Sequence, residues 1–148
     1  MASIYSLSKI VEKDSPDCKI FKYKVKFHDD RPEGDACIFI QRFKTLKHLF
    51  SGVNKPQQAR WRKLGLAKED FFACLDYFYP NGRYFPERDN YLRKGSGTQV
   101  LIDLLADISQ HNPKLIYAVP TNDTIKSFLL RNNWKSGYKN NKILYKLL

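Results

Sequence analysis

The chain has 148 residues, of which 43% are hydrophobic and 14% aromatic, so it is long enough to bury one core and we expect a single compact domain over residues 1–148. The formal charge of +11 favours an anionic partner, a class that includes nucleic acid, a membrane surface and a phosphorylated cofactor. Neither the first residues nor any later stretch contains an apolar run long enough for a signal peptide or a membrane span, so the sequence predicts a soluble, cytoplasmic protein.

The three cysteines, Cys18, Cys37 and Cys74, are widely spaced. They form no Cys-x-x-Cys pair, and no histidine lies at the spacing of a zinc site. We therefore expect reduced, mostly buried thiols and no metal centre.

Two strands are predicted near the N-terminus. Residues Cys18–Phe27 read CKIFKYKVKF, where lysines alternate with aromatic and aliphatic residues in the period-two pattern of a strand with one solvated face. The segment HDDRPEGD is rich in turn residues and ACIFIQRF follows it, which indicates an antiparallel hairpin. The lysines fit a solvated face, with a nucleic-acid track as the alternative.

The middle of the chain predicts a helix. Residues 45–53 fit either a short helix or a loop. Beyond them, acidic residues near 69–70 suit a helix start, and turn residues at 79–82 suit its end. Apolar residues between these limits recur at intervals of three and four, as is typical of a helix: Phe71, Phe72, Leu75 and Phe78.

Residues 83–91, reading RYFPERDNY, predict a loop or an irregular strand, because Pro86 argues against a regular central strand. The aromatic residues here are Tyr84, Phe85 and Tyr91. They either line a ligand cavity beside the glycines that follow or pack in the core.

A glycine turn follows at Gly95 and Gly97, directly after the basic pair Arg93-Lys94. It leads into a helix with one apolar face, which should stop near residues 111–113. Exposed amides at a helix start, with the positive end of the helix dipole behind them, bind anions. The sequence therefore predicts a phosphate site at this turn.

The rest of the chain predicts a strand at 114–119, a second helix and a final strand at 142–148. Thr121 or Asn122 caps the helix, and Ile125, Phe128 and Leu129 form its inward stripe. Strands and helices in this order indicate a mixed α/β domain.

Two motifs in this half match a known pattern. The first is a turn of Gln or Arg, two residues, Gly, any residue, and Gly or Ala, opening a helix; here it is LRKGSG, with Leu92 in the first slot. The second lies in IYAVPTNDTIKSFLLRNNW, where Asn122, Phe128 and Arg131 fall at the expected spacing and Asn133-Trp134 stands for Gly-aromatic. Asn tolerates the left-handed conformation for which Gly is usual.

On these motifs, about residues 91–148 resemble the acetyl-CoA-binding core of the GNAT acetyltransferase superfamily. The resemblance implies a mixed, mostly antiparallel central sheet flanked by helices and splayed where the pantetheine arm inserts, with residues 1–90 as the variable substrate side. It also implies an N-acetyltransferase that moves an acetyl or other acyl group from acetyl-CoA to an amine, on a small molecule or a protein, by direct attack.

The resemblance assigns residues as well. The pyrophosphate of acyl-CoA would be held by Arg93, Lys94, Gly95, Ser96, Gly97 and Thr98, and the pantetheine arm by Asn122. Glu87 and Asp89 are candidates for the catalytic base. Many relatives carry a tyrosine acid in the slot of Leu129, so Tyr138 and Ser127 are the nearest substitutes for the acid.

Two other functions compete with this interpretation. Leu92 and Leu129, both departures from the family pattern, suggest a non-catalytic module of the same fold that binds CoA or a polyanion such as RNA, for which net charge is the only support. A dinucleotide-binding domain ranks below both, because Val100 occupies its third glycine slot.

Overall fold

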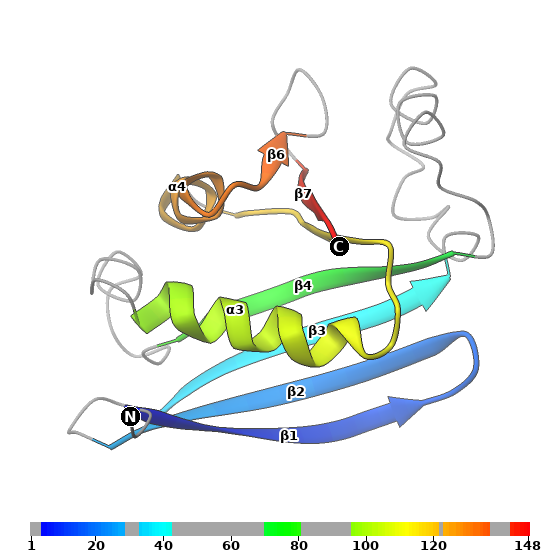
Figure 1. Ribbon diagram of the computed structural model, residues 1–148, viewed down its shortest axis with the longest axis horizontal. Helices are drawn as coiled ribbons and strands as arrows, with labels where there is room; N and C mark the ends of the chain where they lie inside the picture. The colour runs from blue at the N-terminus through cyan, green and yellow to red at the C-terminus, as the bar shows by residue number, and fades with distance from the viewer. Residues whose placement is uncertain (1–3, 29–32, 43–69, 81–95, 122, 137–142) are drawn as a thin grey trace.

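The computed structural model describes residues 4–28, 33–42, 70–80, 96–121, 123–136 and 143–148. These residues form a seven-stranded sheet in the order β1-β2-β3-β4-β5-β7-β6 with two helices, α3 and α4. All neighbouring strands are antiparallel except β4 and β5, which are parallel. The predicted mixed class with a mostly antiparallel sheet is therefore confirmed (Figure 1). The bounds are β1 Tyr5–Asp14, β2 Cys18–Phe27, β3 Gly34–Arg42, β4 Phe71–Tyr79, α3 Ser96–Ser109, β5 Leu115–Ala118, α4 Asp123–Arg131, β6 Lys135–Ser136 and β7 Leu144–Leu147.

The predicted hairpin is formed by β2 and β3. Phe21, Tyr23 and Val25 of β2 are buried while Lys24 and Lys26 are exposed, as the alternating pattern requires. The neighbouring edge strand β1 was not predicted. Most of its side chains are exposed, so its sequence carries little alternation, and its pairing with β2 defines it.

The helix predicted at Phe71–Phe78 is wrong, because these residues form β4 in the middle of the sheet. Ala73 packs into the main core, whereas Phe72 packs with Leu115 and Tyr117 in a second cluster. A central strand that is buried on both faces reads as a continuous apolar run. Such a run satisfies helical spacing as well as strand spacing, so periodicity alone does not distinguish them.

Helix α3 packs its predicted apolar face against the sheet and runs alongside β3 and β4 in Figure 1. The residues it buries are Val100, Leu101, Leu104 and Ile108. Polar contacts join one side of α3 to β1 and β2. The Tyr23 hydroxyl donates to Asp107 Oδ2 at 2.6 Å, and Lys9 Nζ lies 3.0 Å from the same oxygen. The Tyr5 hydroxyl donates to Asp103, one turn earlier.

An asparagine with a left-handed backbone conformation follows each helix, Asn112 with φ 56° after α3 and Asn133 with φ 69° after α4. After α4, the Trp134 amide donates to the Leu129 carbonyl at 3.1 Å, which closes the last turn. The predicted helix-end conformation of Asn133 is confirmed.

Burial raises the pKa of Asp107, but the hydrogen bonds from Tyr23 and Lys9 outweigh it, so the pKa lies below its ordinary value. The folded chain therefore binds this proton less tightly than the unfolded chain does. The resulting stability is complete above the unfolded pKa and is lost as the pH falls through the folded pKa, below about 4.

We expect Tyr23→Phe to reduce the free energy of unfolding at pH 7 by about 1.5–3 kcal/mol, as for a hydrogen bond to a charged group. The ring stays in place because Tyr23 is 1% exposed. Urea unfolding followed by circular dichroism at pH 7 and pH 3 measures the effect, which should shrink at pH 3 as Asp107 becomes protonated. An equal loss at both pH values would contradict this assignment.

Candidate functional site

The sheet opens between its two parallel strands. β4 and β5 pair at three positions, the last of which joins Cys74 to Tyr117. Beyond it, β4 continues along β3 while β5 continues along β7, with Ala118 opposite Leu144. The β3–β4 register shifts so that Asp76 has no opposite residue. Such a bulge bends its strand and increases its twist, and β4 accordingly turns away from β5.

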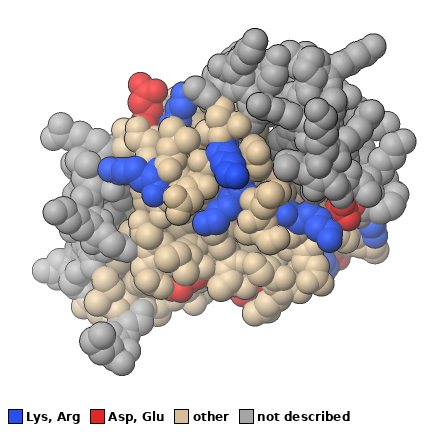
Figure 2. All heavy atoms as spheres, turned by 45° about the horizontal axis from the view of Figure 1, so that its top comes forward, with Lys and Arg blue, Asp and Glu red and all other residues tan. Residues whose placement is uncertain are grey.

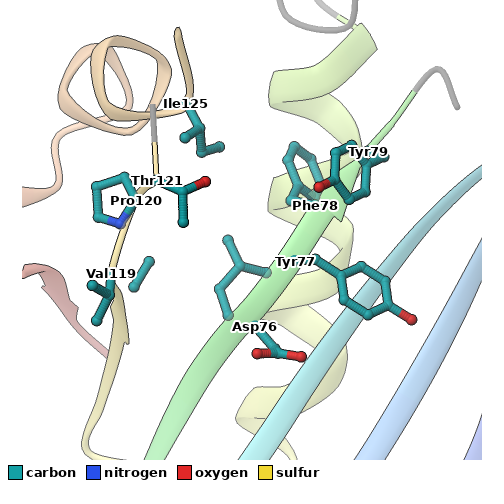
Figure 3. A pocket seen from close by; sticks show the side chains of 10 residues that line it. Asp76, Tyr77, Phe78, Tyr79, Val119, Pro120, Thr121 and Ile125 are labelled. Atoms are coloured by element: carbon teal, nitrogen blue, oxygen red, sulfur yellow. The ribbon is translucent and has the colours of Figure 1, made fainter. Parts of the chain in front are cut away.

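A cleft lies between the diverging strands (Figure 3). Its walls are residues 75–79 of β4, Ala118 at the end of β5, residues 119–121 after it, and Ile125 of α4, and it encloses about 430 Å³ including its open mouth. Leu75, Ala118 and Ile125 make much of the wall apolar. The lining residues that the structure describes include one carboxylate, Asp76, and no lysine, arginine or histidine.

Three polar side chains define the chemistry of the β4 wall. Asp76 is exposed at the bulge. Tyr77 and Tyr79 are half-buried, with ring centroids 6.0 Å apart. Figure 3 shows that the Tyr79 hydroxyl points toward the opposite wall of the cleft, which carries Ile125, whereas the Tyr77 hydroxyl points away from β5.

Cys74 lies two residues before Asp76 on β4 and is paired with Tyr117 of β5. Burial raises the pKa of Cys74 to about 12; the Tyr117 hydroxyl opposes this shift and the charge of Asp76 adds to it. Burial likewise raises the pKa of Tyr117 far above its usual range. Both groups are therefore neutral at physiological pH, and the thiol is a poor nucleophile. The three cysteines are free, as predicted, with Cys37 buried and the other two half-buried.

At Gly97, the start of α3 packs against α4 and against the residue that follows β4. This glycine is buried, and a Cβ added to it would lie 3.3 Å from the Phe128 ring of α4 and 3.6 Å from Pro80 after β4. Gly97 therefore permits close contact between α3, α4 and the end of β4. The first turn of α3 contains no acidic residue, so no carboxylate there offsets the positive end of the helix dipole.

Three of the predicted cofactor-binding residues lie in the described part of the chain. Ser96, Gly97 and Thr98 form the first turn of α3, and Gly97 lies against α4 and the end of β4. Ser127, considered as an acid, is exposed on α4, and Leu129 is completely buried in the core. The remaining predicted residues lie outside the described part of the chain, so their roles stay predictions: Glu87, Asp89, Arg93, Lys94, Gly95, Asn122 and Tyr138.

Sequence reasoning missed Asp76. Residues 71–79 were predicted to form a helix, and a helix would not pair with β5, so no cleft between two strands was expected next to Asp76. The available signal was a single carboxylate inside the apolar run FFACLDYFY, which is unusual in a central strand.

No protein-family model, no curated protein and no solved structure matches the chain. Neither helix in the described ranges is long and apolar enough to cross a membrane. The function therefore has to follow from the topology and from the cleft.

The contact at Gly97 has a measurable consequence. We expect Gly97→Val to reduce the free energy of unfolding by about 1–3 kcal/mol through overpacking against Phe128. Combining it with Phe128→Leu should cost less than the sum of the two single changes, because the smaller side chain makes room.

Urea titrations of the four proteins measure this coupling. Ala106→Val is the matched control, because it introduces the same side chain at an exposed position of the same helix and should cost less than about 1 kcal/mol. A Gly97→Val cost no larger than the control's would show that the contact is not tight.

Proposed function

We propose that this chain is an acyl-CoA-dependent N-acyltransferase of the GNAT type, which transfers an acetyl or other acyl group to an amine. The observation that carries the proposal is the divergence of β4 and β5 at the Asp76 bulge, with the start of α3 packed against α4 and the end of β4. The family resemblance of residues 91–148 implies a sheet splayed where the pantetheine arm inserts. The one parallel pair among the described strands separates in this way.

The residues present suit the parts of an acyl-CoA. The start of α3 suits its pyrophosphate, because amides and an uncompensated helix dipole favour an anion. Arg93 and Lys94, which precede that turn in the sequence, add positive charge. The apolar walls at Leu75, Ala118 and Ile125 suit the uncharged pantetheine arm.

The acyl thioester supplies an electrophilic carbonyl carbon. The amine nitrogen forms a C–N bond to this carbon as the C–S bond breaks, so an ammonium acceptor must lose two protons, one to solvent and one to the departing thiolate. Asp76 is suited to bind the ammonium group, to accept the first proton and to release it to solvent, since it is the carboxylate among the described residues that line the cleft. Tyr79 is suited to protonate the thiolate and to regain its proton from the amine, because its hydroxyl faces the cleft (Figure 3).

The first test is binding of acetyl-CoA by isothermal titration calorimetry. We expect a dissociation constant in the micromolar range, and at least tenfold weaker binding by Lys94→Glu, which reverses a charge next to the predicted pyrophosphate. Lys13→Glu makes the same charge change on the edge strand β1 and should leave the affinity within twofold. Absence of binding at millimolar acetyl-CoA, or equal losses in both variants, would refute the cofactor assignment.

The second test concerns Asp76. With a panel of monoamines, polyamines and peptide N-termini, release of the CoA thiol reports transfer. For any amine that the wild type acylates, Asp76→Asn should lower kcat/KM by about 10²–10⁴-fold, the usual contribution of a positioned base, while acetyl-CoA affinity is retained.

The control for this test is Glu12→Gln. Glu12 is also an exposed carboxylate at a β-bulge, but it lies on β1 and pairs with Lys22. Its removal should leave kcat/KM within twofold. Wild-type rates in Asp76→Asn would exclude Asp76 from the chemistry.

A further inference from the structure

Positive charge is distributed unevenly over the described residues. In β1 to β3, most basic side chains have a carboxylate partner. Lys9 pairs with Asp107 on α3, Lys22 with Glu12 and Lys24 with Glu33, at nitrogen–oxygen distances of 3.0, 2.9 and 3.4 Å. Lys19 and Arg42 are paired as well, with Asp14 and Asp17. The large N-terminal part of the sheet is therefore locally neutralised.

The C-terminal part has the opposite character. From residue 113 to the end of the chain, the sequence contains a single acidic residue, Asp123. The basic residues described there are Lys114, Lys126, Arg131, Lys135 and Lys146, and none of them forms an ion pair with a described residue. Within the described part of the chain, no carboxylate therefore compensates their charge.

Three of these cations, Arg131, Lys135 and Lys146, surround the β6 edge of the sheet. Arg131 is exposed in the last turn of α4. Lys135 lies opposite Tyr145 on β7, so these two share one face of the sheet. Lys146 is on the other face, with Nζ 3.5 Å from the Asn132 carbonyl oxygen. Figure 2, turned to bring the top of Figure 1 forward, shows lysine and arginine side chains across the middle of this surface and acidic side chains mainly at its margins.

We infer that this basic edge, formed by Arg131, Lys135 and Lys146, binds the phosphate backbone of single-stranded RNA. A flexible chain of phosphates can follow an edge and reach cations on both faces of the sheet, and each neutralised phosphate releases counterions. The edge lies outside the cleft and shares no residue with its lining, so RNA binding there is independent of the proposed acyl transfer.

An anionic membrane fits this edge less well. A helix that binds a membrane surface presents a broad apolar face to the lipid. The apolar side of α4, Phe128 and Leu129, is instead buried in the core, which leaves Leu130 as the exposed large apolar residue of this helix. A flat bilayer also meets one face of a sheet rather than two.

The experiment uses the full chain, without CoA, and a fluorescein-labelled 20-nucleotide oligouridine. Fluorescence anisotropy between 50 and 200 mM KCl gives the affinity and its salt dependence. We expect Arg131→Glu/Lys135→Glu to bind at least tenfold more weakly than the wild type. Loss of two phosphate contacts should also lower the slope of log K against log salt by about 1.4, at roughly 0.7 per contact for single strands.

Lys13→Glu/Lys26→Glu is the matched control. It makes the same change in net charge at exposed lysines of β1 and β2, across the sheet, and should weaken binding less than threefold. Thermal melting confirms that both variants are folded. Equal losses in the two variants would overturn the inference in favour of a diffuse charge effect. So would a wild type that does not bind the RNA but binds phosphatidylserine vesicles in sedimentation.

Discussion

The bulge at Asp76 is the constraint on which the rest of the site depends. β4 must remain paired with β3 across the bulge, and β5 must remain paired with β7. Over residues 72–74, β4 pairs with β3 and β5 at once, but past the bulge it pairs with β3 alone, and the two parallel strands separate after Cys74 and Tyr117. One extra residue thus converts the middle of a sheet into a cleft and places a carboxylate at its wall.

The close approach of the helices depends on the same region. Pro80 directly follows β4, and Phe128 lies one turn beyond the cleft residue Ile125. Both would contact a side chain at position 97. The absence of a side chain there therefore links the end of β4, the start of α3 and α4 in one packed unit. A ligand at the start of α3 would meet a rigid support, which is what accurate positioning of a reacting group requires.

Acid and base are segregated in this molecule. The described wall of the cleft carries Asp76 and no cation, although the chain as a whole has a formal charge of +11. Most lysines and arginines of β1 to β3 form ion pairs with carboxylates, whereas the described cations around β6 and β7 form none with a described residue. A small cationic acceptor and a large anionic partner would therefore be attracted to different places on the same domain.

Sequence periodicity predicted β2 and α3 because the apolar residues of each repeat with a clear period, and β3 was predicted from the turn residues between it and β2. Asn133 was predicted for a similarly local reason, since a helix end requires a residue that tolerates positive φ. β4 failed because both of its faces are buried, and the edge strand β1 failed because so few of its side chains are. The lone carboxylate in the apolar run marked Asp76 as unusual, but its place at a bulge beside the cleft arises only from the pairing of distant segments and could not be predicted.

The contacts of α3 with β1 also bear on how the chain folds. Tyr5 with Asp103, and Lys9 with Asp107, each join residues 98 positions apart. Contacts of such long range are reached slowly, because the intervening chain must close a large loop first. During synthesis the hairpin of β1 and β2 is complete well before α3 exists, so the inward aromatic face at Tyr5, Phe21 and Tyr23 has no covering helix at that stage. The nascent hairpin is therefore the segment of this protein most in need of protection from aggregation while it waits for its C-terminal half.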